Sequence, residues 1–373
     1  IKNYPVYLGQ LDYFLEPFIT DMDDATVKKQ LKLFFTNVDR TVLDSFSHAD
    51  IGPKATRAGY LILEVQAELE NAIPNISMKY DPEITDDDFA LVCVKCALKT
   101  AKPSFANHRM FKNELGENYV IASCYNGLLL GGGAYTLCRL ILGHIAERSA
   151  GIEDFKNNQL PYVMDVMAKY MDARIAFEVE QSGFFESNFL AKEGLIHRDR
   201  FTGMFGLVGL ADAVNVLMTK EGKDDRFGHS DAATQLGIEI MDIINEFNNN
   251  HFNKYCEGTG SHFLLHAQVG IAEDKGIAPG TRIPIGEEPE ELVDHLNVIS
   301  NFHKYFVSGT GDIFPVDLTV HKNPEYVLDI IKGSWQKDIR YLSFYSSDSD
   351  VIRITGYLVK RSEIEKYEQG NAV

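Results

Sequence analysis

The sequence has few positive charges and no long apolar run. Its 373 residues carry 36 lysines and arginines against 54 aspartates and glutamates, which gives a net charge of −18. Nucleic acids and anionic membranes both require basic surface, so neither is expected as the main partner. No apolar stretch reaches the roughly 18 residues that a membrane-spanning helix needs, and no signal-peptide pattern opens the chain. We therefore expect a cytoplasmic protein without a membrane segment.

Cysteine is also scarce. The five cysteines are Cys93, Cys96, Cys124, Cys138 and Cys256. An odd number at irregular spacing in a large chain indicates reduced thiols and not a disulfide framework. Cys93 and Cys96 form a CxxC on a predicted helix, but no second CxxC completes a metal site. Cys138 falls in another predicted helix, where we expect it to be part of the core. The sequence therefore predicts no bound metal.

Apolar periodicity predicts alternating helices and strands. A helix should follow Asp23, because apolar residues recur at helical spacing at Val27, Leu31, Phe34, Val38, Val42 and Phe46. Further helices are predicted over 55–72, 86–100, 134–148, 160–182 and 231–250, and strands over 75–80, 119–123 and 261–271. Such alternation is typical of the α/β class. We expect one domain over residues 1–373, and the first residue, Ile1, is consistent with an N-terminally truncated or processed chain.

The C-terminal pattern Arg353-Ile-Thr-Gly356-Tyr357 is the most informative motif. Taken alone, Gly356 fits an ordinary strand-to-turn glycine equally well. It also fits a site that stores a backbone radical, because a radical at Cα is delocalised only when the flanking amides are coplanar with it. A Cβ clashes with that geometry, and glycine has none. The motif resembles the C-terminal signature of glycyl radical enzymes, in which one backbone glycine carries a stable radical.

A stored radical needs a cysteine that relays it to the substrate, and Cys124 fits this role best. It follows a short apolar predicted strand and precedes a glycine-rich turn, far in sequence from Gly356. A thiol at the tip of such a loop can be presented to a substrate. The alternative is that Cys124 is a buried small hydrophobe, as free cysteines usually are.

Cys256 is the alternative nucleophile. Glu257 follows it directly and could act as a general base, and the polar neighbours predict a surface loop. Two other functions therefore stay open beside a radical enzyme. One is a closed-shell thiol enzyme that uses Cys256 and Glu257, and the other is a metabolite-binding barrel without radical chemistry.

Several segments in order make the resemblance more specific. They cover residues 74–82, 103–108, the Cys124 loop, 206–212 and 353–358, and together they resemble the YjjI-type glycyl radical enzyme family over most of residues 70–360. The resemblance implies a ten-stranded α/β barrel of two five-stranded parallel half-sheets with surrounding helices. The cysteine loop and the glycine loop, the latter within a C-terminal segment over 340–373, would meet inside it.

The resemblance also implies the chemistry and the partners. Gly356 would store the radical, and Cys124 would become a thiyl that abstracts hydrogen from a small polar metabolite. Arg353 and Tyr357 would hold the glycine loop, and the predicted substrate-site residues are Asn107, His108, Tyr125 and Asn126. A separate radical-SAM iron–sulfur enzyme would install the oxygen-sensitive radical, so we expect no tightly bound cofactor. A homodimer is implied as well.

Three departures narrow the reaction. Eliminases of the superfamily place a glutamate two residues after the cysteine, where this chain has Asn126. Pyruvate formate-lyase has two adjacent cysteines, whereas Cys124 lies between Ser123 and Tyr125. Anaerobic ribonucleotide reductases carry a four-cysteine zinc site near the radical glycine, and no cysteine follows Cys256 here. We therefore expect none of these three reactions in its typical form.

Overall fold

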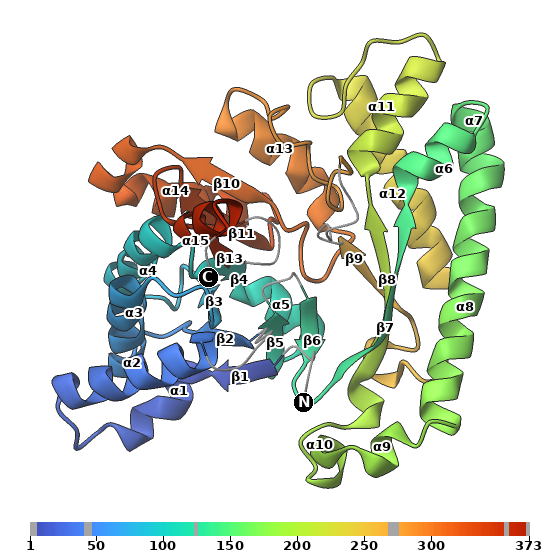
Figure 1. The fold of residues 1–373 in the computed structure, drawn as a ribbon. Helices are drawn as coiled ribbons and strands as arrows, with labels where there is room; N and C mark the ends of the chain where they lie inside the picture. The colour runs from blue at the N-terminus through green and yellow to red at the C-terminus, as the bar shows by residue number, and fades with distance from the viewer. Residues whose placement is uncertain (1–5, 41–46, 123–125, 268–275, 354–357, 371–373) are drawn as a thin grey trace. The chain divides into compact units, whose positions relative to one another are not determined.

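The chain forms two compact units in a computed structural model (Figure 1). The structure describes residues 6–40, 47–122, 126–267, 276–353 and 358–370. The first unit comprises Ile1–Asn113, Val120–Asn126 and Asp312–Val373, and the second comprises Glu114–Tyr119 and Gly127–Gly311. The single domain expected over residues 1–373 stays a prediction.

A six-stranded sheet organises the first unit, in the order β1-β2-β3-β4-β11-β10. Strands β1 to β4 run parallel, β11 pairs antiparallel with β4, and β10 pairs parallel with β11. The strands are β1 (Val6–Gln10), β2 (Ser47–Ile51), β3 (Asn75–Tyr80), β4 (Ser104–Asn107), β10 (Ile313–Val316) and β11 (Tyr341–Ser346). The helices are α1 (Leu11–Leu15), α2 (Asp24–Arg40), α3 (Arg57–Leu69), α4 (Asp87–Thr100), α5 (His108–Leu115), α14 (Pro324–Trp335) and α15 (Arg361–Glu368). The short strands β12 (Val351–Arg353) and β13 (Leu358–Lys360) form a separate antiparallel pair.

One face of this sheet is apolar. Phe105, Phe344 and Phe314 form an aromatic row across β4, β11 and β10, with ring centroids 6.4 and 5.8 Å apart. Helices α3, α4 and α14 pack against one another beside the sheet (Figure 1). Trp335 of α14 donates from Nε1 to the carbonyl oxygen of Tyr80 at 3.2 Å. Because side chains alternate between the two faces of a strand, the polar residues between these apolar ones lie on the other face.

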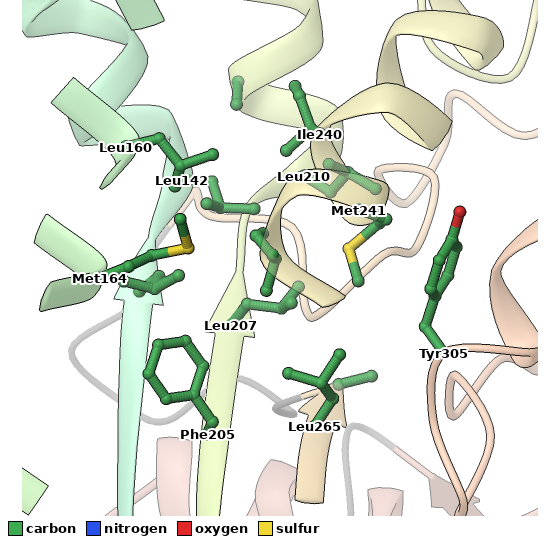
Figure 2. Packing of buried hydrophobic residues seen from close by; sticks show 14 of the residues in the cluster. Leu142, Leu160, Met164, Phe205, Leu207, Leu210, Ile240, Met241, Leu265 and Tyr305 are labelled. Carbon is green, nitrogen blue, oxygen red and sulfur yellow. The ribbon is translucent and has the colours of Figure 1, made fainter. Parts of the chain in front are cut away.

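The second unit is built on the parallel sheet β7-β8-β9. Its strands are β7 (Gly133–Ile141), β8 (Phe201–Val208) and β9 (Leu264–Ala267), and its helices are α6 (Leu142–Arg148), α7 (Ile152–Asp154), α8 (Leu160–Glu180), α9 (Phe184–Ser187), α10 (Phe189–Lys192), α11 (Leu210–Lys220), α12 (Asp231–Asn250) and α13 (Leu292–His303). Figure 2 shows Phe205 and Leu207 of β8 between side chains of α8 and α12, such as Met164 and Met241. This apolar core holds the three strands and the long helices together. Strands β5 (Tyr119–Ala122) and β6 (Asn126–Leu129) form a two-stranded sheet.

Most predicted elements are confirmed, with small shifts. The helix after Asp23 is α2, in which Phe35 is buried and Phe34 is exposed, the reverse of the expectation. Val42 and Phe46 of the predicted pattern lie outside the described residues. The helices over 55–72, 86–100, 160–182 and 231–250 correspond to α3, α4, α8 and α12, and the strands over 75–80 and 119–123 to β3 and β5. The Asp86 side chain caps α4 by accepting from the backbone N–H of Asp88 at 2.8 Å. Of the strand predicted over 261–271, residues Leu264–Ala267 form β9, and 268–271 lie outside the described residues.

The helix predicted over 134–148 was wrong in its first half. Residues Gly133–Ile141 form β7, and only Leu142–Arg148 is helical. Pairing with β8 along the whole strand overrides the local helical pattern. The glycines before the strand serve close packing, because a Cβ at Gly132 would collide with the carbonyl oxygen of Arg200. Cys138 consequently lies in strand β7 and not in the predicted helix, and its side chain is partly buried.

The cysteines of the described part of the chain are free thiols. Cys93, Cys96 and Cys256 are buried, and Cys138 is partly buried. Within the described residues, no three histidine, cysteine or acidic side chains gather in a way that could hold a metal ion. None of the helices in these residues is both long enough and apolar enough to cross a membrane.

Truncating a core side chain should destabilise the protein far more than the same change at the surface. Ile240 is fully buried in the core of the second unit, whereas Ile285 is 85% exposed. Ile240→Ala should lower the free energy of unfolding by about 2–5 kcal/mol, because it leaves a cavity. Ile285→Ala should change it by less than about 0.5 kcal/mol. Denaturant titrations of both variants measure this, and equal effects would contradict the assigned core.

Candidate active site

The proposed radical residues lie in two short segments outside the described residues. Cys124 and Tyr125 fall in 123–125, and Gly356 and Tyr357 fall in 354–357. Asn126 opens β6, and its side chain is also outside the described part. The structure does describe the strands that lead into both segments. These are β5 before Cys124, and β12 and β13 on the two sides of Gly356.

The strands that flank Gly356 pair closely. Arg353, the last residue of β12, pairs with Leu358, the first residue of β13. Val351 and Leu358 are buried, and they pack in one cluster with Ala101. The two ends of the segment 354–357 are thus brought together by strand pairing and by burial.

Arg353 is a buried cation without a carboxylate partner among the described residues. Its side chain is 4% exposed. Nη2 donates to Asn75 Oδ1 and to the carbonyl oxygen of Ala101, both at 3.1 Å. Nε and Nη1 are buried and have no hydrogen-bond partner in the described part of the structure. A buried donor of a charged group that lacks an acceptor is costly. Arg353 therefore has two N–H groups that could still bind an acceptor outside the described residues.

The second face of the six-stranded sheet is polar although it is buried. We call this the polar face, and it consists of His48, Asp50, Asn75, Ser77, Lys79, Ser104, Tyr341 and Ser343, all at most 5% exposed. Four of these side chains form two hydrogen-bonded pairs. Ser104 Oγ lies 2.8 Å from Ser343 Oγ, and Ser77 Oγ lies 3.2 Å from Tyr341 Oη. A buried sheet face is usually apolar, so this face is the strongest structural sign of a functional site in the first unit.

Asp50 is the most constrained group on the polar face. Its Oδ2 accepts from Tyr7 Oη at 2.8 Å and from the backbone N–H of Ile121 at 3.4 Å, and it lies 3.5 Å from Lys79 Nζ. Its Oδ1 is buried and has no hydrogen-bond partner among the described residues. Ile121 belongs to β5, three residues before Cys124. The strand that leads to the proposed radical cysteine is therefore bonded to the polar face.

Burial controls the ionisation of this face. Burial raises the pKa of Asp50 to about 6, although the Lys79 ammonium and the hydrogen bonds from Tyr7 and Ile121 act to lower it. Burial, helped by the nearby charge of Arg353, lowers the pKa of His48 to about 3. His48 is therefore neutral near pH 7, whereas Asp50 can take or release a proton close to neutrality. A pKa in this range is typical of a general acid or base.

Sequence reasoning missed Asp50, Lys79 and His48. The signal that could have found them is the recurrence of polar residues at every second position in the segments HADI and NISMK. Alternation normally indicates that the polar side faces water. Only the burial of these residues distinguishes an internal polar face from an ordinary solvent-exposed one.

The predicted substrate residues Asn107 and His108 are buried at the end of β4 and the start of α5. The Asn107 side chain donates from Nδ2 to the carbonyl oxygen of Ile339 at 3.3 Å and accepts from the backbone N–H of Met110 at 3.4 Å. Both ends of its amide thus serve the protein backbone. A role for Asn107 and His108 in binding substrate stays a prediction.

Cys256 has the surroundings of a structural cysteine. It is fully buried, so the surface loop expected from its polar neighbours was wrong. Its Sγ accepts from the backbone N–H of Gly203 at 3.3 Å, and burial raises the pKa of the thiol. Glu257 is exposed and lies 3.9 Å from Arg198 Nη2. A thiol nucleophile needs a lowered pKa, so these surroundings do not favour the Cys256–Glu257 mechanism.

Replacing Asp50 with asparagine tests the ionisation of the polar face. The pKa of Asp50 is about 6 in the folded protein against an ordinary value of 3.8, so the folded state binds more protons between these values and stability falls as the pH rises. Between about pH 4.5 and 7.5, this group should lower the free energy of unfolding by about 2 kcal/mol. Asp50→Asn should remove that part of the pH dependence in denaturant titrations. An identical pH dependence in parent and variant would contradict the assignment.

The chain has clear relatives in sequence and in structure. It matches the family described as glycyl radical enzyme YjjI-like over residues 1–373. An uncharacterised protein of Haemophilus influenzae is 48% identical over 99% of this chain and 72% of its own length. The uncharacterised protein YjjI of Escherichia coli is 41% identical over 98% of this chain and 71% of its own length.

Two solved structures show the same fold at low identity. A glycyl radical enzyme from Archaeoglobus fulgidus matches with a TM-score of 0.76 at 14% identity, over 96% of this chain and 63% of that one. The anaerobic ribonucleotide reductase of Thermotoga maritima, in complex with dATP and CTP, matches with a TM-score of 0.73 at 13% identity, over 99% of this chain and 74% of that one. The mixed α/β fold is therefore that of glycyl radical enzymes. On the family match and the two close relatives, the chain belongs to the YjjI-like glycyl radical enzyme family.

Proposed function

We propose that this protein is a glycyl radical enzyme that stores its radical on Gly356 and relays it to Cys124. The Cys124 thiyl would then abstract a hydrogen atom from a small polar substrate. Tyr357 and Arg353 would hold the glycine segment, Arg353 through charge-assisted hydrogen bonds. Tyr125 and Asn126 would lie beside the substrate.

One observation carries the proposal. Arg353, three residues before Gly356, is bonded to Asn75 on β3, and Ile121, three residues before Cys124, is bonded to Asp50 on the neighbouring strand β2. Asp50 pairs with Ser77, two residues beyond Asn75, which is about 7 Å along the strand. Three residues of chain reach at most about 11 Å. Chain length therefore allows the segments that carry Gly356 and Cys124 to approach each other over the same buried polar face.

The remaining parts of the proposal, which are the barrel, the activase and the dimer, are inferred from membership of the family. The fold would be a ten-stranded α/β barrel of two five-stranded parallel half-sheets. A radical-SAM iron–sulfur activase would take the hydrogen from Gly356, and the enzyme would act as a homodimer without a tightly bound cofactor. Asn126 in place of glutamate, the absence of a cysteine beside Cys124, and the absence of cysteines after Cys256 set the reaction apart from those of typical family members.

The radical itself is the test of this function. Co-expression with a radical-SAM activase, followed by anaerobic EPR, should give a doublet, because one hydrogen remains on the radical carbon of Gly356. Gly356→Ala should give no such signal. Gly333→Ala is the matched control, because Gly333 lies in α14 with open space at its Cβ position. This variant should keep the full doublet.

A doublet that survives Gly356→Ala would contradict the assignment. If the activase works on another glycyl radical enzyme but gives no signal with this one, the radical function fails. The protein would then be better described as a metabolite-binding barrel.

A further inference from the structure

Lys102 is a fully buried lysine between α4 and β4. Its Nζ donates to the carbonyl oxygens of Ala72 at 3.1 Å and of Pro74 at 2.7 Å, in the turn before β3. Within the described part of the chain, these carbonyl oxygens are its partners and no carboxylate pairs with it. Two acceptors match the two N–H groups of a neutral amine, whereas an ammonium has three. A buried ammonium without a counter-ion is unfavourable, so this site favours the neutral form of Lys102.

Arg353 brings a second positive charge to the same two turns. Its Nη2 donates to Asn75 Oδ1, at the start of β3, and to the carbonyl oxygen of Ala101, which directly precedes Lys102. Lys360, at the end of β13, adds a third cation near Lys102. A guanidinium group does not lose its proton in proteins. Of the two buried cations, only Lys102 can therefore relieve the repulsion, by losing its proton.

The strand pair β12–β13 sits on the turn that Lys102 shares. Val351 of β12 and Leu358 of β13 pack with Ala101 in one buried apolar cluster. Ala101 has a φ of 56°, which is uncommon for a residue other than glycine. A strained residue is kept where its surroundings require it, and the methyl group that a glycine would lack belongs to this cluster. The cluster and the bonds of Arg353 thus seat the strand pair beside the Lys102 ammonium.

We propose that Lys102 controls, through its charge, how firmly the strand pair β12–β13 is seated. A protonated Lys102 repels Arg353 and loosens the pair. A neutral Lys102 keeps its two hydrogen bonds and removes the repulsion, so the pair sits firmly. Lys102 is then a positioning residue that acts through Arg353. Because β12 and β13 flank Gly356, it would also set how firmly the proposed radical segment is held, and that consequence rests on the proposed function.

The direction of the pH effect follows from the groups that face Lys102. Burial lowers its pKa to about 7, and the charges of Arg353 and Lys360 act in the same direction. Asp39 on α2 and Cys96 on α4 act to raise it. Release of the strand pair takes Arg353 and Lys360 away, so the pKa of Lys102 rises. The released form therefore binds more protons above about pH 7, and a rising pH favours the seated form.

Hydrogen exchange of the unactivated protein tests this proposal without the radical. The amides of β12 and β13 are followed at low denaturant concentration, where exchange that does not depend on denaturant reports local opening and not unfolding of the unit. Their protection, corrected for the intrinsic pH dependence of exchange, should rise about threefold or more between about pH 6 and pH 9. The rise should not exceed about tenfold per pH unit, because a single proton is linked to release.

Three variants and a control separate charge from structure. Lys102→Met removes the charge and should make the protection independent of pH. Lys102→Arg keeps the charge at every pH, so the protection should stay low and should not rise. Lys360→Met removes one repelling charge and should move the midpoint of the parent's rise to higher pH, which a merely structural lysine would not do. Lys99→Met is the matched control, because Lys99 is on the same helix but 51% exposed, and it should keep the parent's pH dependence.

A protection that does not change with pH in the parent would overturn the proposal. So would a pH dependence that survives in Lys102→Met, or an unchanged midpoint in Lys360→Met. If Lys102→Met does not fold, the parent and Lys360→Met decide the question. The radical function fails separately, because the doublet is measured on the activated protein. A full doublet with pH-independent protection would remove the role of Lys102 alone, and pH-dependent protection without a doublet would remove the radical function alone.

Discussion

The burial of a polar sheet face is the constraint on which the rest of the first unit depends. On strands β2, β3, β4 and β11, most apolar side chains lie on one side of the sheet and most polar ones on the other, and nearly all of them are buried. The apolar side is covered by helices and stabilises the unit by removing area from water. The polar side must satisfy its own hydrogen bonds, as Ser104 with Ser343 and Ser77 with Tyr341 do.

Two of the buried groups that are not fully hydrogen-bonded lie beside the segments of the proposed radical residues. Arg353 keeps two buried donor nitrogens unpaired within the described residues, and it precedes the segment of Gly356. Asp50 keeps one acceptor oxygen unpaired there, and it holds the strand that precedes Cys124. Unsatisfied buried groups cost stability, so function is one explanation for those beside the two segments of the proposed radical residues.

Most helices and the family could be predicted from the sequence. Helical periodicity and caps identified α2, α3, α4, α8 and α12, and the C-terminal motif with the ordered segments indicated the family that the comparisons confirm. The first half of the predicted 134–148 helix failed, because pairing with the distant strand β8 decides its conformation. Asp50 and Lys79 were missed, because alternation in sequence cannot distinguish water from an internal site. Cys256 was misplaced, because polar neighbours do not reveal that a thiol points into a core.

The most direct test of the account is the EPR spectrum of the activated protein after transfer into D2O. The central claim is that hydrogen passes between Cα of Gly356 and the thiol of Cys124, and a thiol exchanges its hydrogen with solvent. Deuterium should therefore reach Gly356 in the parent and collapse the doublet into a narrow singlet. A Cys124→Ser variant should keep the doublet in D2O. A doublet that persists in the parent, or one that collapses equally fast in both proteins, would contradict the relay.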